Sequence, residues 1–151
     1  MRTATSCPLC ATARAPGPDH LASLDECEIV LGENQGCRGW CVAILRDHAE
    51  HMDDLSPQRQ SRVWGDVARV ARAIRRVFPA AGEGGGPVRL NYECLGNVVP
   101  HIHWHIVPRH AGEPDLRSAV WLRSPEALRG SLTPDERRQL AAGLREALRR
   151  T

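Results

Sequence analysis

The sequence contains no lysine, so all 20 of its basic residues are arginines. Any phosphate clamp or catalytic amine in this chain therefore cannot be a lysine. Eighteen acidic residues nearly balance the arginines and leave a formal net charge of +2. This balance offers no support for a nucleic-acid partner or for binding at a membrane surface.

Long apolar runs are also missing. No segment approaches the roughly 20 apolar residues that are needed to span a bilayer, and residues 1–8 lack the apolar core of a signal peptide. We therefore expect a cytoplasmic protein with no membrane partner. In that compartment the six cysteines are expected to be free thiols or metal ligands rather than a disulfide framework.

Aromatic residues make up only 4% of the chain, but four of the six are tryptophans, which we expect to anchor packing. The length of 151 residues fits one domain spanning 1–151, and the 42% hydrophobic content is sufficient for a core.

Two segments carry helix signals. Ser56 before Pro57 is a typical helix start, and apolar residues then recur at spacings of three and four as far as Phe78. This stripe comprises Val63, Val67, Val70, Ile74 and Val77, widened by Trp64, Ala71 and Phe78. Thr133 and Glu136 form a capping box that opens a C-terminal helix, whose apolar positions are Leu140, Leu144, Ala147 and Leu148.

Short apolar runs between turn residues predict strands at 28–31, 40–45, 88–92 and 101–107, the last of them ended by Pro108. Residues 11–20 and 111–130 are expected to be mostly loop, and Gly82–Pro87 a flexible turn. The order of these elements favours the α+β class, with an antiparallel sheet covered on one side by helix.

Three histidines alternate with apolar residues in the last predicted strand, as His101-Ile102-His103-Trp104-His105-Ile106. Alternate residues of a strand share a face, so the three imidazoles are expected to line one surface and the apolar residues to enter the core. Imidazole is a good nucleophile toward phosphorus and changes its charge near neutral pH. The pattern therefore indicates phosphate chemistry by nucleophilic and acid-base catalysis.

Residues 101–107 resemble the signature of the histidine triad (HIT) superfamily, and Pro108 and Arg109 match it as well. The preceding Leu95–Pro100 is similar to the stretch that leads into the triad, with Asn97 in place of a glutamine. The resemblance extends from Cys7 to Arg109 and implies a HIT-like fold. Such a fold has an antiparallel sheet of about five strands, a central helix, a C-terminal helix and a variable tail, here about 111–151.

The resemblance implies that His103 attacks the α-phosphorus of a nucleotide. The covalent nucleotidyl-histidine is then hydrolysed or passed to another acceptor. His105 would support departure of the leaving group, and His101 would orient the nucleophile or bind a metal. The implied substrates are dinucleoside polyphosphates or nucleoside phosphoramidates, with no organic cofactor.

The same resemblance implies further substrate contacts. Asn97 would contact the phosphate or the leaving group, Asn91 and Gly96 would shape the phosphate loop, and Asn34 would lie near the ribose. Arg109 is a phosphate contact or a solvated surface residue, with both interpretations open. Members of the family usually pair through the central helix and the sheet edge, so a homodimer is expected.

Cys7 and Cys10 form a CxxC pair, which by itself fits a redox pair, half of a zinc site or neither. A tetrahedral zinc site needs two further ligands. Many bacterial triad proteins and the related galactose-1-phosphate uridylyltransferases are similar here, and this likeness implies His48 and His101. The result would be a structural zinc knuckle at about 1–20, with His51 as the competitor of His48.

Two other functions remain open from the residues alone. In one, His101, His103 and His105 together bind a catalytic metal that activates water. In the other, the chain is a non-catalytic nucleotide-binding regulatory module. Trp40 stands where most relatives carry a histidine, and we expect it to pack in the core or to form a wall of the base pocket.

Overall fold

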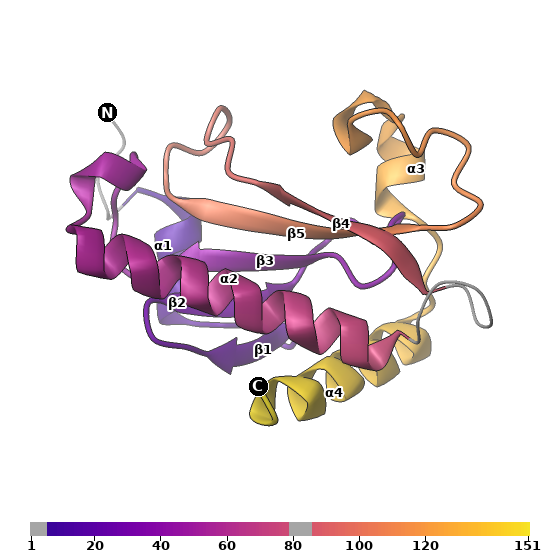
Figure 1. The fold of residues 1–151 in the computed structure, drawn as a ribbon, viewed down its shortest axis with the longest axis horizontal. Helices are drawn as coiled ribbons and strands as arrows, with labels where there is room; N and C mark the ends of the chain where they lie inside the picture. Colours follow the sequence, from indigo (N-terminus) through magenta and orange to yellow (C-terminus); the bar gives the residue numbers. More distant parts are fainter. Residues whose placement is uncertain (1–5, 79–85) are drawn as a thin grey trace.

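The computed structural model describes residues 6–78 and 86–151, so most of the turn expected at Gly82–Pro87 lies outside the described residues. Five strands form one antiparallel sheet in the order β1-β2-β3-β5-β4 (Figure 1). The strands are β1 (His20–Ser23), β2 (Cys27–Leu31), β3 (Cys41–Leu45), β4 (Pro87–Glu93) and β5 (His103–His110). The predicted α+β class with an antiparallel five-stranded sheet is confirmed.

The helices are α1 (Pro8–Arg14), α2 (Pro57–Val77), α3 (Pro125–Arg129) and α4 (Pro134–Arg149), with single 3-10 turns at Met52–Asp54 and Val120–Leu122. The two long helices were predicted. The expectation of loop at 11–20 and 111–130 was wrong in part, because α1 and α3 are short helices there. Each of them has a proline in its first turn, where the missing N–H costs nothing.

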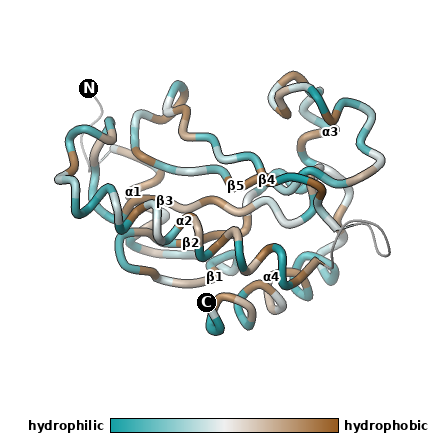
Figure 2. The backbone as a smooth tube through the Cα atoms, in the orientation of Figure 1, coloured by the Kyte–Doolittle hydropathy of each residue, from teal (hydrophilic) through white to brown (hydrophobic). Residues whose placement is uncertain are grey.

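The helices α2 and α4 cover one face of the sheet. Ser56 caps α2 by accepting a hydrogen bond from the backbone N–H of Arg59, at 3.4 Å. The predicted stripe is buried at Val63, Val67, Val70 and Ile74, but Trp64 is 51% exposed and does not widen it. The capping box of Thr133 and Glu136 is present, and Leu140, Leu144, Ala147 and Leu148 are buried. In Figure 2, α2 alternates between hydrophobic and hydrophilic residues, whereas β3 is hydrophobic throughout.

The opposite face of the sheet is also partly covered, which corrects the expectation of helix on one side only. A second apolar cluster on this face joins α1, β3 and the tail. Its buried members are Ala13, Cys37, Trp40, Val42, Ile44, Val107 and Val120. Strand β3 lies between β2 and β5. Its residues belong alternately to the core beneath α2 and α4 and to this second cluster, so each of them is apolar and buried.

The triad strand runs from His103 to His110, not from 101 to 107 as predicted. Pro108 does not end it. The pairing of β3 with β5 stops at Cys41 and Ile106, so β5 is an edge strand on that side at Pro108, where a missing N–H is tolerated. At the other end, Ile102 bonds irregularly to the backbone of Ala49 and Leu45, which keeps it outside the strand.

The tail is joined to the loop between β2 and β3. The backbone N–H groups of Gln35 and Gly36 donate to the carbonyls of Arg129 and Leu128, at 3.0 and 2.8 Å. A Cβ on Gly36 would lie only 1.8 Å from the carbonyl oxygen of Ala127, so no other residue fits this approach. Gly130 has a φ of +72° at the end of α3 and meets the same loop.

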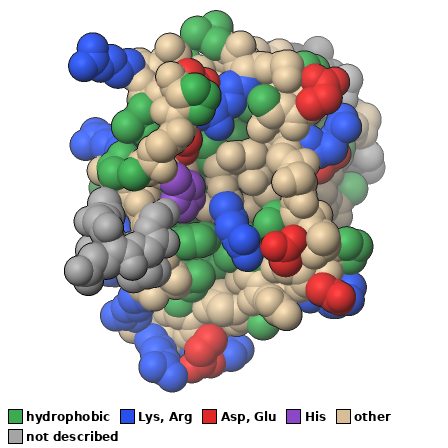
Figure 3. Space-filling view, turned by 90° about the vertical axis from the view of Figure 1, so that its right-hand side faces the viewer, with side chains coloured by type: hydrophobic (Ala, Val, Ile, Leu, Met, Phe, Trp, Pro, Cys, Tyr) green, Lys and Arg blue, Asp and Glu red, His purple; other side chains and the backbone are tan. Residues whose placement is uncertain are grey.

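Charges of both signs occur together on the one end of the molecule that Figure 3 shows. On the end of the molecule that carries α3, basic and acidic side chains are interspersed among hydrophobic ones (Figure 3). Among the described residues, no helix combines the length and the apolar character that crossing a membrane requires.

Candidate functional site

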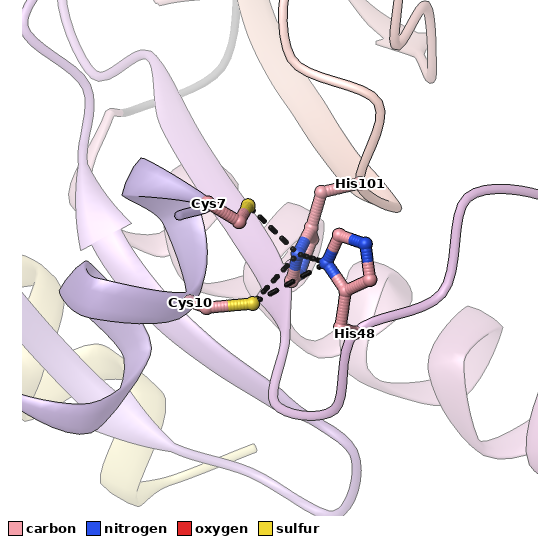
Figure 4. A group of neighbouring side chains, drawn as sticks. All are labelled: Cys7, Cys10, His48 and His101. Carbon is pink, nitrogen blue, oxygen red and sulfur yellow. Dashed lines mark hydrogen bonds between the residues drawn. The ribbon is translucent and has the colours of Figure 1, made fainter. Parts of the chain in front are cut away.

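Four side chains from three separate segments converge beside the N-terminal helix (Figure 4). Cys7 is the N-cap residue of α1 and Cys10 lies in its first turn, His48 follows β3, and His101 precedes β5. The Nδ1 atom of His101 lies 3.5 Å from the Sγ of Cys7, 3.4 Å from the Sγ of Cys10 and 3.3 Å from the Nδ1 of His48. Their four ligand atoms all lie within 4.8 Å of one another.

A hydrogen bond on the far side of the His101 ring makes these four residues suitable for binding a metal ion. Its Nε2 lies 2.8 Å from the carbonyl oxygen of Leu45. A carbonyl only accepts, so Nε2 carries the proton and Nδ1 presents its lone pair to the cysteines and His48. Burial lowers the pKa of His101, which favours the neutral ring that a metal ligand requires. Two thiolates and two neutral imidazoles are a typical tetrahedral zinc set. His51, the expected competitor, lies outside the group.

His103 is oriented by the backbone of its neighbour in the triad. Its Nδ1 lies 2.6 Å from the carbonyl oxygen of His101 and therefore carries the proton. The Nε2 of His103 then holds the free lone pair, and no described protein group bonds to it. The residue lines a cleft, so this lone pair is available to a substrate.

The cleft lies on the face of the sheet opposite α2 and has a volume of about 420 Å³. Strands β2, β3 and β5 form its floor, α1 forms one side and the tail another. Its lining residues are Leu9, Thr12, Val30, Leu31, Gly32, Glu33, Asn34, Trp40, Val42, Ile44, Val99, His103, His105 and Trp121. Apolar walls with a few polar groups are typical of small-molecule sites.

His105 lies between two tryptophans. Its ring centroid is 5.6 Å from that of Trp40 and 5.0 Å from that of Trp121, both in edge-on contact. The Nε1–H of Trp40 donates to the Nδ1 of His105 at 3.1 Å. Burial, with a smaller contribution from the charge of His103, lowers the pKa of His105 to about 4. His105 is therefore neutral at physiological pH.

Sequence reasoning missed this role of Trp40, which is a buried core residue and also a hydrogen-bond donor to the triad. The feature that could have revealed this role is the position of Trp40 relative to the strand that pairs with the triad. Trp40 lies two residues before Val42, which pairs with His105, so strand alternation places the indole on the triad side. Gln35 fixes the loop by donating to the carbonyls of Gly32 and Trp40 and by accepting from the N–H of Gly39.

Among the five residues expected to contact substrate, the structure brings only Asn34 to the cleft. Asn97 is exposed in the loop between β4 and β5, and Gly96 lies in the same loop with a φ of +69°. The side-chain oxygen of Asn91 accepts a hydrogen bond from Arg109 at 3.2 Å and does not line the cleft.

Arg109 is only 3% exposed, so it is neither a solvated residue nor a lining residue of the cleft. Its guanidinium donates to the Glu113 carboxylate at 2.8 Å and to the carbonyls of Ser118 and Asp115. Arg123 forms ion pairs with the carboxylates of Glu113 and Asp115, and the Arg109 guanidinium lies 3.6 Å from the Asp115 carboxylate. These buried ion pairs fasten the tail to β5, and they occupy the groups that a phosphate would need.

The three histidines do not share one surface as expected. His101 is fully buried among Cys7, Cys10 and His48, while His103 and His105 face the cleft with ring centroids 5.0 Å apart. The reason is that the regular strand begins only at His103. Among the described residues, no metal-binding group formed by all three triad histidines is found, which removes the geometric basis for a three-histidine catalytic metal.

Comparison with known proteins gives a consistent result. The HIT domain family matches residues 19–112. Protein hit of Bacillus subtilis is 30% identical over 122 residues, covering 80% of this chain and 82% of that protein. The asymmetrical bis(5'-nucleosyl)-tetraphosphatase of Schizosaccharomyces pombe is 30% identical over 71 residues, 47% of this chain and 38% of that protein.

Solved structures share the fold. A Zn-bound histidine triad family protein from Mycobacterium smegmatis superimposes with a TM-score of 0.66 at 22% identity, covering 98% of this chain and 96% of that one.

Proposed function

The chain belongs to the HIT family, and we propose that it is a nucleotide hydrolase or nucleotidyl transferase that acts at the α-phosphate through His103. The observation that carries the proposal is the orientation of this ring. Because Nδ1 donates to the His101 carbonyl at 2.6 Å, the nucleophilic Nε2 lone pair is free at the cleft. An imidazole held in this tautomer is prepared for attack without a separate base.

In the proposed reaction, Nε2 of His103 forms a bond to the α-phosphorus while the bond between phosphorus and the leaving group breaks. The electron pair leaves with the departing atom. Water or another acceptor then forms a bond to phosphorus and gives up its proton to solvent, while the bond between phosphorus and Nε2 breaks and its electron pair returns to the His103 ring. The positive charge of the nucleotidyl-imidazolium is balanced by the phosphate that it carries, and the His101 carbonyl accepts from Nδ1–H throughout.

The proposed substrates are dinucleoside polyphosphates or nucleoside phosphoramidates. The dinucleoside tetraphosphatase among the relatives supports the first class. The apolar side chains of Val30, Val42 and Ile44 offer a surface for a base, and Asn34 offers polar groups for a ribose.

A labelling experiment tests the covalent step. After mixing with a nucleotide labelled at the α-phosphate, we expect acid-labile label on His103, located by mass spectrometry. The variant His103→Ala should lose both label and turnover. His51→Ala is the matched control, because that histidine is exposed and lies outside both the cleft and the metal cluster. Tight nucleotide binding without turnover in the parent protein and in His103→Ala would instead support a regulatory module.

We further propose that Cys7, Cys10, His48 and His101 hold a structural zinc ion. The donor set and the His101 tautomer support this, and the M. smegmatis relative is Zn-bound. When bound, zinc would fix α1 against the segment that precedes β5. Elemental analysis of purified protein should give one zinc per chain, and His51→Ala should keep it while His48→Ala loses it.

We propose a homodimer that pairs through α2 and the edge strand β4. Large hydrophobic side chains are exposed there, with Trp64 51%, Val88 44% and Tyr92 36% accessible. Trp64 contacts both Tyr92 and Trp104, and the buried indole N–H of Trp104 has no partner among the described residues. Light scattering at micromolar concentration should give twice the chain mass of 16.7 kDa, and a monomer would contradict the proposal.

A further inference from the structure

The contact between Trp40 and His105 has a consequence for the leaving group. An indole N–H only donates hydrogen bonds and has no lone pair to accept one. Because it lies 3.1 Å from the Nδ1 of His105, that nitrogen must be unprotonated. The single ring proton of His105 therefore resides on Nε2, which no described protein group engages.

The surroundings of Trp40 disfavour any state of His105 in which Nδ1 carries a proton. Protonating Nδ1 would place two donors face to face, and relief would require moving Trp40, which is 1% exposed. The loop that carries Trp40 is in turn fixed by the three hydrogen bonds of Gln35. The other aromatic neighbour, Trp121, does not compete, since its Nε1–H donates to the carboxylate of Glu93.

The titratable groups around His105 do not provide an alternative donor of a proton to the leaving group. His103, on the same strand, uses Nδ1–H for the His101 carbonyl and Nε2 as the nucleophile. Glu93, which pairs with His105 from β4, accepts from Trp121. Glu33 lines the same cleft and is exposed. A neutral His105 can donate a hydrogen bond through Nε2, but transfer of that proton would leave an imidazolate.

We propose that Trp40 confines His105 to one neutral tautomer, so that the site stabilises a departing oxyanion but cannot protonate a departing amine. This inference rests on the proposed function and narrows it to phosphoanhydrides, such as dinucleoside polyphosphates, over phosphoramidates. In the first class the P–O bond breaks and the phosphate leaves as a stable anion that accepts from His105. In the second the P–N bond breaks and the nitrogen needs a proton, which the site does not supply.

The tautomer is tested without any turnover. In ¹⁵N-labelled protein, two-dimensional spectra of the imidazoles should show His105 with an unprotonated Nδ1 and a protonated Nε2 from pH 5 to pH 8. Trp121→Phe, which removes the indole that donates to Glu93, should keep this pattern. A protonated Nδ1 in the parent protein at pH 6 to 7, in either the neutral or the doubly protonated ring, would overturn the proposal.

Selectivity is tested with an adenosine polyphosphate and an adenosine phosphoramidate of the same nucleotide. General acid catalysis contributes roughly 10² to 10⁴-fold, so kcat/KM should favour the anhydride by at least about 10²-fold. In Trp40→His a ring that can also accept a hydrogen bond replaces the indole, and the preference should narrow at least about tenfold through kcat. Equal rates in the parent protein, or an unchanged preference in a folded Trp40→His, would overturn the inference.

A leaving-group series on the parent protein covers the case in which Trp40→His does not fold. Rates for aryl esters of the same nucleotide should fall steeply as the leaving group becomes more basic, because its charge is not neutralised by a proton. A shallow dependence would overturn the inference. If no nucleotide is cleaved at all, the proposed function fails and the selectivity with it, whereas the His105 spectra still decide the Trp40 contact.

Discussion

The metal cluster, formed by Cys7, Cys10, His48 and His101, and the cleft contain histidines that are only two residues apart in the sequence. Their environments are nevertheless opposite. His101 is sealed among two cysteines and His48, with its proton held by the Leu45 carbonyl. His103 has its proton on the other nitrogen and keeps a free lone pair at the cleft. In each ring a backbone carbonyl selects the tautomer. Identical side chains in one motif thus receive different chemistry from the main chain around them.

The comparison predicts that the two regions fail in different ways when they are altered. Changes in the metal cluster should lower stability, and changes in the cleft should lower turnover. The link between them is the His101 carbonyl, which belongs to a metal-cluster residue and orients the ring of His103, the proposed nucleophile.

The largest effect is expected from loss of a metal ligand. Cys10→Ser should abolish zinc binding and lower the free energy of unfolding by on the order of 5 kcal/mol, because binding energy at a structural zinc is folding energy. Chemical denaturation with and without added zinc measures this. The same unfolding midpoint for both proteins, with zinc present, would show that the cluster does not hold a stabilising metal.

The next effect is on chemistry alone. His103→Ala should reduce kcat/KM by at least about 10³-fold, since the nucleophile is removed and the remaining groups act only with it. Its unfolding midpoint should stay close to that of the parent, because the ring is partly exposed and makes one hydrogen bond. A large loss of stability in this variant would break the division between the two regions.

A smaller effect should appear in the pH dependence of stability. The pKa of His105 is about 4 in the folded protein and 6.5 as a reference value for the unfolded chain. Above pH 6.5 the ring is neutral in both states and contributes no pH dependence. Between pH 6.5 and 4 only the unfolded chain gains the proton, so stability falls with falling pH by about 1 to 3 kcal/mol. Below pH 4 no further loss is expected from this group.

Urea unfolding at pH 7 and pH 4.5 checks the sign and size of this effect. In His105→Gln the loss between the two pH values should be smaller than in the parent, because the other titrating groups are common to both. Equal losses in the two proteins would place His105 in a more hydrated environment.

The smallest change serves as a reference for both regions. Thr133→Ala removes the side-chain cap of α4 and half of its capping box, which should cost about 1 kcal/mol of stability. Since α4 packs mainly on α2 and β1, and Thr133 itself belongs neither to the cleft lining nor to the metal cluster, zinc content and kcat/KM should be those of the parent. A change in either would mean that they respond to global stability and not to local contacts.

The elements that could be predicted from the sequence are those with a local physical cause. The cap at Ser56 and the spacing from Val63 to Ile74 determine α2 without reference to the rest of the chain. The capping box at Thr133 does the same for α4. Strand runs such as 40–45 also carry their own signal, with an error of one residue at the start of β3.

The features that were missed depend on partners distant in sequence. Pro108 can lie within β5 only because the pairing of β5 with β3 stops at Ile106. No local pattern in the sequence predicts where that pairing stops. His101 does not share a face with the other two triad histidines. Its Nδ1 contacts the Sγ atoms of Cys7 and Cys10, and its Nε2 donates to the carbonyl of Leu45. The group of Cys7, Cys10, His48 and His101 was predicted through the resemblance to a family, since spacing supplied only the cysteine pair.

Arg109 shows the same limit in a single residue. Next to the alternating histidines, a guanidinium suggests a phosphate contact. Its carboxylate partners, Glu113 and Asp115, are close in sequence, but only folding of the tail brings them around it. Counting charges does not reveal which of them are already paired inside the protein.

The close approach of Gly36 to the tail constrains any chimaera that is built on this chain. The tail contributes Trp121 to the cleft wall. The course of the tail depends on Gly36, which precedes Trp121 by 85 positions and donates a backbone hydrogen bond to Leu128. A tail transplanted from a relative would dock only onto a recipient whose β2–β3 loop has no side chain at that point. Replacement of the C-terminal segment of this chain therefore requires moving the β2–β3 loop and the tail as one module.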